Sequence, residues 1–218
     1  MPSLPALTLL EARVLGVLVE KQHTVPDSYP LTLNALVAGC NQKSSRDPVL
    51  DASHAEVQAA IDHLRSLALV METSGGRVMR YSHNAGKVLG LPPQSVALLA
   101  VLFLRGPQTP GELRISADRL HRFGDLLAVQ AFLDELAERP GGALVRELPR
   151  APGARENRWT HLLSGEPAQA AAVHGAPPAP AAGPSERSSL EARIERLEAE
   201  VRDLRGLVEA LRAARPDD

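Results

Sequence analysis

The stretch that decides the fold spans residues 53–82 and reads SHAEVQAAIDHLRSLALVMETSGGRVMRYS. It opens with Ser53 and Glu56, the S-x-x-E pattern of a helix N-terminus, and apolar residues then recur at helical spacing. From residue 69 apolar and polar residues alternate instead, and Ser74-Gly75-Gly76 favours a tight turn. The stretch therefore predicts a helix followed by two short strands, over residues 69–73 and 77–82.

Two more helices are expected upstream. The first begins at Thr8 and Glu11, a second S/T-x-x-E pattern, and is expected to end near Lys21, ahead of the prolines at positions 26 and 30. The next is expected over residues 32–41. Three helices followed by a hairpin form the pattern of a winged-helix domain, a fold that serves docking rather than catalysis.

Residues 91–165 repeat this order. Helices are expected to start at Pro92-Pro93, at Thr109-Pro110-Gly111-Glu112 and at Asp125, and strands are expected over residues 143–148 and 158–163. The sequence thus predicts an α+β fold, mostly α, with tandem winged-helix domains followed by a C-terminal coiled-coil helix. The expected domains are residues 1–88 and 89–165, each small enough that we expect the two halves to pack on each other.

The remaining residues are expected to form a linker and a dimerisation helix. Residues 166–189 are rich in alanine and proline, which is typical of a flexible linker, and residues 190–213 repeat apolar residues in heptads. β-branched residues at a and leucine at d favour a parallel dimer, and the alternative is an amphipathic helix that folds back on its own domains. The predicted dimer contacts are Leu190, Ile194, Leu197, Val201, Leu204, Val208 and Leu211.

The charge balance weighs against a tightly bound nucleic acid. The chain has 24 Lys and Arg against 26 Asp and Glu, a formal net charge of −2. Residues 1–90 carry 8 basic and 8 acidic side chains, and residues 91–165 carry 9 and 8. Proteins that bind phosphates tightly present a basic excess, which neither half has.

Polar loops supply the candidate contact residues. Loop 41–48 reads NQKSSRDP and is either a solvated connection or a contact surface. Loop 149–157 carries arginines that either lie along phosphates or keep a hairpin tip soluble. The candidate residues for contact with nucleic acid or a partner are Asn41, Gln42, Lys43, Arg46, Arg77, Arg80, Arg150 and Arg155.

The third helix of each half would enter the DNA groove in a winged helix, and its outward side chains would read the bases. In the second half these outward residues include Asp134, Glu135 and Glu138, which would repel phosphate and suit a protein contact better. In the first half, the helix from residue 54 offers a mixture of acidic, basic and neutral side chains, so its role stays open.

The sequence predicts no catalytic, cofactor-binding or metal-binding residues. The seven histidines are scattered, and Cys40, the single cysteine, cannot build a thiolate site and fits a small buried side chain in a reducing compartment. The longest apolar run, residues 96–104, is too short to cross a membrane, and no signal-peptide pattern is present. We therefore expect a cytoplasmic protein.

Several short motifs occur in a characteristic order. They are LLEARV at 9–14, YPL at 29–31, CNQK at 40–43, RDPV at 46–49, RG at 105–106, TPGELR at 109–114, HL at 161–162 and SG at 164–165. In these motifs the chain resembles the YceH family of bacterial proteins, over roughly residues 7–165. The resemblance implies a tandem winged-helix fold and implies little about activity. It also adds weight to a functional role for loop 41–48, because that loop matches a family hallmark.

Taken together, these patterns predict a non-enzymatic, homodimeric binding protein without metal or cofactor. DNA is the usual partner of the fold, and we expect any contact with it to be weak and directed mainly at phosphates. The alternative is a protein-docking adaptor that uses the winged helices as a protein-binding surface.

The heptads predict that the full chain is a dimer at micromolar concentration and that a chain truncated after Gly165 is a monomer, which light scattering distinguishes. Leu197→Pro is expected to abolish the dimer, because proline within a helix costs ~3 kcal/mol or more. Ala182→Pro, in the expected linker, is the matched control and should leave the dimer intact. If the full chain proves monomeric, the coiled-coil interpretation is wrong.

Overall fold

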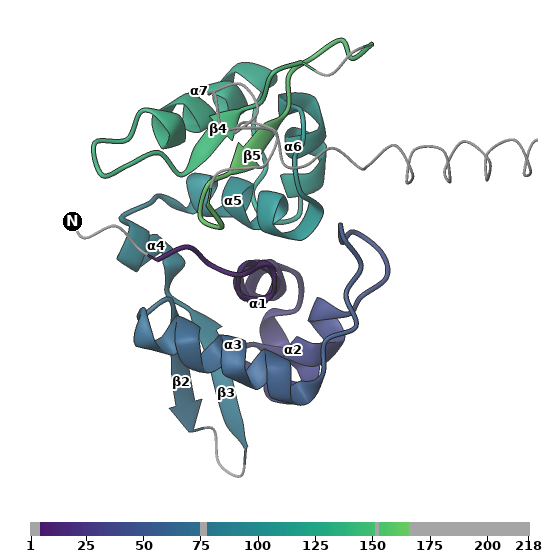
Figure 1. Cartoon of the computed structure of the whole chain (residues 1–218), viewed down its shortest axis with the longest axis vertical. Coiled ribbons are helices and arrows are strands. Elements are labelled where there is room, and N and C mark those ends of the chain that lie inside the picture. The colour runs from purple at the N-terminus through teal and green to yellow at the C-terminus, as the bar shows by residue number, and fades with distance from the viewer. Residues whose placement is uncertain (1–4, 75–77, 151–152, 166–218) are drawn as a thin grey trace, which may run out of the picture. The chain divides into compact units, whose positions relative to one another are not determined.

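Capped helices form most of the first half of the chain. The computed structural model describes residues 5–74, 78–150 and 153–165. The capping boxes predicted at Thr8–Glu11 and Ser53–Glu56 are both present, and they satisfy backbone N–H groups that the helices themselves leave without partners. The helices of this half are α1 (Leu9–Thr24), α2 (Leu33–Cys40), α3 (His54–Ser66) and α4 (Ala85–Leu89), with a short 3-10 turn, η1, at Pro26–Ser28 (Figure 1).

A small antiparallel sheet completes this half. Its strands are β1 (Leu31–Thr32), β2 (Val70–Ser74) and β3 (Met79–His83), in the order β1-β3-β2. Leu31 lies opposite Tyr81 in the register. The predicted hairpin is confirmed, with its strands displaced by one or two residues. The sequence did not predict β1, because a strand of two residues has no periodicity to detect.

The second half repeats the order of elements, and the fold is α+β and mostly α. Its elements are α5 (Pro93–Arg105), α6 (Pro110–Ala117), α7 (Leu126–Ala137), β4 (Val145–Glu147) and β5 (Trp159–His161). Strands β4 and β5 pair antiparallel and are shorter than the sequence predicts. The backbones of Gln108 and Trp159 exchange hydrogen bonds of 3.0 and 2.7 Å, at the place in the order where β1 pairs in the first half.

Two helix boundaries differ from the prediction. Helix α1 continues past Lys21 to Thr24, because proline at position 26 restricts only the residue before it, Val25, and the Thr24 hydroxyl donates to the Glu20 carbonyl at 3.0 Å. Helix α4 was not predicted. It is only five residues long and ends at Gly90, whose φ of 63° places it in the left-handed region that glycine tolerates.

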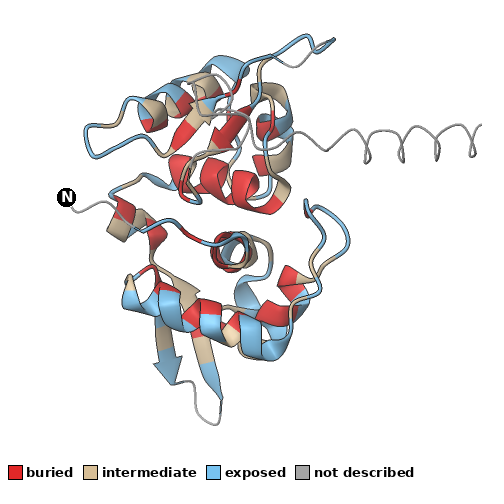
Figure 2. Ribbon diagram, in the orientation of Figure 1, coloured by how far each residue is buried: buried red, intermediate tan, exposed pale blue. Residues whose placement is uncertain are grey.

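The core is centred on α1 and α5, which pack against each other (Figure 1). The sequence predicts a single apolar stripe on α1, but every residue from Glu11 to Val19 is buried. In α5, all residues from Ser95 to Leu104 are buried, and Figure 2 shows both helices largely in the colour of buried residues. Both helices are covered all round because each packs on its own half and on the other helix.

The described residues of both halves belong to one compact unit. The expected boundary between residues 88 and 89 falls within this unit, at the end of α4. The expected linker (166–189), the coiled-coil helix (190–213) and Arg77 lie outside the described residues.

Glycines set how closely α1 is approached by its neighbours. A Cβ at Gly16 would lie 3.0 Å from Leu104 of α5, and a Cβ at Gly39 of α2 would lie 2.6 Å from Cγ1 of Val17. The second distance is shorter than carbon atoms tolerate, so α2 packs at this spacing only without a side chain at position 39.

Gly39→Ala is expected to lower the free energy of unfolding by about 1–3 kcal/mol, because the new methyl group forces α1 and α2 apart. Gly111→Ala in α6 is the matched control. Its Cβ meets nothing closer than 3.9 Å, so the higher helix propensity of alanine should stabilise that variant by up to ~1 kcal/mol. Urea unfolding measures both variants, and a Gly39→Ala protein as stable as the parent would contradict the close approach.

Candidate functional site

Loop 41–48 is held by hydrogen bonds of its own side chains to nearby segments and within the loop. The Asn41 side chain accepts from the Ala52 N–H and donates to the Ala52 carbonyl, both at 2.8 Å. The amide of Gln42 donates to the Ser44 carbonyl at 2.9 Å and accepts from Lys21 at 3.4 Å. These side chains therefore hold the shape of the loop.

The prediction that Arg46 is an exposed contact residue is wrong. Its side chain is fully buried. Its guanidinium donates to the Gly39 carbonyl at 3.1 Å and to both carboxylate oxygens of Glu20, at 3.1 and 2.6 Å. The loop turns Arg46 inward, so this arginine is not available to a phosphate. The sequence does not reveal that Arg46 is buried, because the partner of Arg46, Glu20, lies far away in the sequence, in α1.

Arg13 is also fully buried, and like Arg46 it contacts the C-terminal end of α2. It donates to the carbonyls of Cys40 and Pro48, at 3.2 and 2.7 Å. The last carbonyls of a helix lack partners within the helix and carry partial negative charge, so cations placed there stabilise it. Arg13 and Arg46 thus cap the C-terminus of α2 from the interior.

The electrostatics of Glu20 fit this arrangement. Burial raises the pKa of the Glu20 carboxyl, but the hydrogen bonds and positive charge of Arg46, helped by Lys21, outweigh it and hold the pKa below its usual value. Glu20 is therefore ionised at neutral pH and paired with Arg46.

The same loop joins the first half to the second. The Asp47 N–H donates to the Leu104 carbonyl of α5 at 2.8 Å. Arg105 donates to the Ser45 hydroxyl at 2.8 Å. Loop 41–48 therefore ties α2 to the end of α5, which is a structural role.

The other predicted contact residues lie apart from this cluster. Arg80 donates to the carbonyl of Pro30 at 2.7 Å and reaches that of Ser28 at 3.3 Å. Lys43, Arg150 and Arg155 are exposed. Arg150 and Arg155 lie together in the loop after β4, where they line a hollow with α7.

This hollow between α7 and the β4–β5 loop is the candidate partner site. Its volume is about 450 Å³. Besides residues of the β4–β5 loop, its lining includes Pro110 and three residues of α7, which are Leu126, Leu127 and Gln130. Leu126 is 46% exposed and Leu127 is 79% exposed, large values for leucine. The charged residues that line it are Glu147, Arg150, Arg155 and Glu156. These leucines were not predicted as contact residues, although they follow the N-cap Asp125 directly and lie outside the apolar stripe of α7, which is a usable signal.

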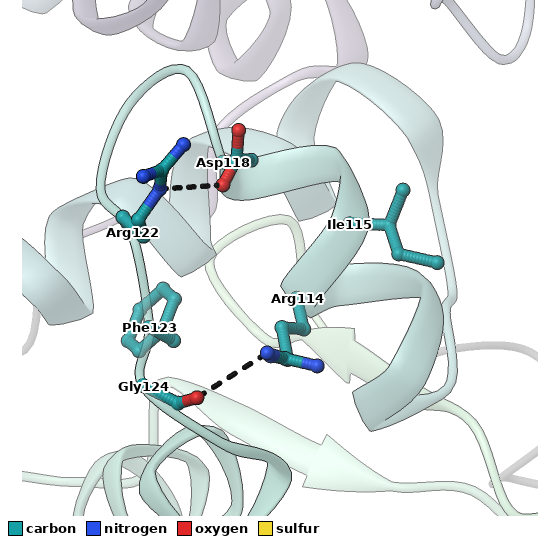
Figure 3. Close-up of a pocket in the computed structure, with 6 residues that line it drawn as sticks. All are labelled: Arg114, Ile115, Asp118, Arg122, Phe123 and Gly124. Carbon is teal, nitrogen blue, oxygen red and sulfur yellow. Dashed lines mark hydrogen bonds and ion pairs between the residues drawn. The ribbon is translucent and has the colours of Figure 1, made fainter.

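A second hollow, of about 540 Å³, lies beside α6 (Figure 3). Its polar side chains are already paired. Arg114 donates to the Gly124 carbonyl at 3.2 Å, and Arg122 pairs with Asp118 at 3.3 Å, as the dashed lines in Figure 3 show. These contacts fix the loop between α6 and α7, so this hollow is a weaker candidate for a partner site.

The outward side chains of α3 are also paired with their protein neighbours. Asp62 accepts from Gln58 at 3.0 Å and pairs with Arg65 at 3.4 Å, and Arg65 also pairs with Glu72 of β2. His63 contacts Glu11 at 2.7 Å. A base-reading helix needs free donors on this face, and here they are engaged.

Neither a reactive cysteine nor a metal-binding group occurs in the described residues. Burial raises the pKa of the Cys40 thiol to about 11, which keeps it protonated and a poor nucleophile. Residues 5–74, 78–150 and 153–165 contain no group of three or more His, Cys, Asp or Glu placed to hold a metal ion. Within the same residues, no helix is long and apolar enough to cross a membrane.

Comparison with known proteins identifies relatives of the whole chain. Residues 7–154 match a family described as "Protein of unknown function, DUF480". A UPF0502 protein of Dechloromonas aromatica (strain RCB) is 58% identical over 206 residues, covering 94% of this chain and 96% of that protein. UPF0502 proteins of Burkholderia pseudomallei (strain 668) and Burkholderia orbicola (strain MC0-3) are 58% and 56% identical, covering 95% and 96% of this chain and 88% and 89% of theirs.

Arg46→Ala is expected to lower the free energy of unfolding by about 3 kcal/mol, because it leaves the carboxylate of Glu20 without its partner in a largely buried site. Lys43→Ala, three residues earlier and exposed, is the matched control and should stay within about 0.5 kcal/mol of the parent. Equal stability of the two variants in urea unfolding would contradict the stabilising role of the Arg46–Glu20 pair.

The same pair predicts a pH dependence. The pKa of Glu20 is lowered in the folded protein from its usual 4.5. The ionised carboxylate therefore contributes fully to the free energy of unfolding above pH 4.5, and this contribution is lost as the pH falls below that value. The stability difference between the parent and Arg46→Ala should therefore narrow in acid.

Proposed function

The chain belongs to the DUF480 family, the YceH-type family that includes the UPF0502 proteins, and we propose that it is a non-catalytic protein that docks another protein on its second winged-helix repeat. The family description assigns no activity. The support for protein docking therefore comes from the structure of this chain.

The shared order of elements supports two winged-helix repeats. Each half has a helix, an extended segment, two further helices and a hairpin, and in each the extended segment pairs with the second strand of the hairpin. On this basis α3 and α7 are the helices that would face a ligand of the fold.

The exposed face of α7 is the observation that carries the proposal. Its first turn presents Leu126 and Leu127, and its last turn presents Asp134 and Glu135, with Glu138 directly after the helix. A DNA groove is flanked by phosphates, so the acidic residues of this face have the wrong charge. The amide of Gln130, a side chain of the kind that reads bases, already donates to Asp134 at 2.9 Å. Exposed leucines beside a hollow suit an apolar side chain of a protein partner.

DNA remains the weaker alternative on this evidence. With Arg46 buried and Arg80 bonded to backbone carbonyls, the exposed cations among the described candidates are Lys43, Arg150 and Arg155. Three phosphate contacts in each chain would give weak, sequence-independent binding with a log–log salt slope of about −2.7.

The homodimer stays part of the proposal and rests on the heptads of residues 190–213. A dimer would present two copies of the docking surface, and joining them raises the apparent affinity for any partner that bears two binding segments.

The proposal predicts that a protein partner co-purifies with the native protein and stays bound after nuclease digestion. The double variant Leu126→Asp, Leu127→Asp is expected to lose that partner, because charged groups cannot replace leucines in an apolar contact. Val78→Asp, at a position 54% exposed near the first hairpin, is the matched control and should keep it.

Titration of labelled random duplexes at 50 and 200 mM salt tests the alternative. If the chain binds DNA through these three cations, we expect a weak affinity that falls about 40-fold between 50 and 200 mM salt. Tight, salt-tolerant binding to one DNA sequence, together with loss of the co-purifying protein on nuclease treatment, would replace protein docking with DNA recognition.

A further inference from the structure

A third hollow, of about 520 Å³, lies where α4 meets the second half. Residues 5 and 6, the connection from α7 to β4 and the segment that follows β5 complete its wall. Backbone hydrogen bonds fix these segments: the Leu7 N–H donates to the Leu163 carbonyl and the Leu162 N–H donates to the Leu144 carbonyl, at 2.7 and 2.8 Å. None of the residues that line it lines the hollow beside α7, so it is a separate site.

The lining combines apolar walls with positive charge. Its charged residues are Lys87 and Arg139, and no acidic side chain among the described residues lines it. The apolar walls include Pro5, Ala6, Val88, Leu89, Leu144 and Leu162. The other hollows described above differ, because acidic residues line each of them.

Arg139 is held in place in this wall. Its guanidinium donates to the Leu89 carbonyl at the end of α4. It lies beside Gly90 and Gly141, where even a Cβ would be only 3.7 and 3.8 Å from it. One edge of the planar guanidinium is therefore fixed, and its remaining donors are oriented before any ligand arrives.

The charges of Lys87 and Arg139 are not neutralised within the described residues. Neither side chain forms an ion pair with an aspartate or glutamate there. Cations of this kind beside an apolar hollow complement an anionic group attached to an apolar body.

We propose that this hollow binds a small molecule with an apolar body and one anionic group, a carboxylate or a phosphate. The apolar body lies against Val88, Leu89 and Leu144, and the anion meets Lys87 and Arg139. The volume is within the range of small-molecule sites, which is about 300–1,000 Å³. Because the wall is drawn from both halves of the chain, the ligand would strengthen the contact between α4 and the second half.

Calorimetric titration of the full chain with octanoate, octyl phosphate, 1-octanol and inorganic phosphate tests the proposal. Octanoate or octyl phosphate is expected to bind saturably with one molecule per chain, and the stronger of the two identifies the anionic group. Octanol is expected to bind about tenfold more weakly, because it lacks the charge that the cations recognise, and inorganic phosphate more weakly still.

Variants locate the binding. Lys87→Gln should weaken binding of the anionic ligand about tenfold and leave octanol unchanged. Lys43→Gln, at an exposed lysine outside the hollow, is the matched control and should change the affinity for neither the anionic ligand nor octanol. Ala143→Phe, which places a ring in the hollow, should remove binding of every octyl compound, with thermal melts of each variant confirming that it is folded.

Three results would overturn the proposal. They are the absence of saturable binding with any octyl compound at millimolar concentration, equal affinity for octanol and octanoate, and unchanged affinity in Lys87→Gln. The last two would show that the hollow takes apolar compounds without recognising an anion.

Discussion

The packing of α1 against α5 is the contact on which the rest of the structure depends. Each helix is the first helix of its half, and burial all round makes both part of a single shared core. A half of this size can bury only a small core by itself. Packing α5 on the outer face of α1 buries apolar surface that each half alone would leave exposed. Gly16 at this crossing and Gly39 on the α2 side let the backbones approach closely.

The buried arginines make the second constraint. A charged side chain inside a protein is costly unless it is paired and hydrogen-bonded, and each guanidinium nitrogen of Arg46 donates either to Glu20 or to the Gly39 carbonyl near the end of α2. Removing any member of the group leaves a charge or a carbonyl without its partner. This gives a physical reason for Asn41 and Arg46, two motif residues of loop 41–48, that requires no ligand, since the side chain of each makes an internal contact.

These constraints favour the second half as the place for the proposed protein contact. The first half uses loop 41–48 and the outward face of α3 in internal contacts. By contrast, α7 exposes its leucines beside a hollow, and α4 joins the second half around a hollow with a positively charged edge. The proposed sites for a protein and for a small anion share no lining residue, so a ligand at one would influence the other only through the shared core.

The sequence by itself determined the elements whose causes are local. The caps at Thr8, Ser53, Thr109 and Asp125 each depend on a residue three positions away, and the first hairpin depends on its alternation and turn. Only the tertiary structure decided which side chains are buried. Arg46 is internal because Glu20 lies 26 residues earlier, α1 is covered all round because α5 packs on it, and Leu126 and Leu127 stay exposed because no described segment covers them. Such contacts join residues far apart in the chain, and periodicity reports only what one segment needs, not what another segment supplies.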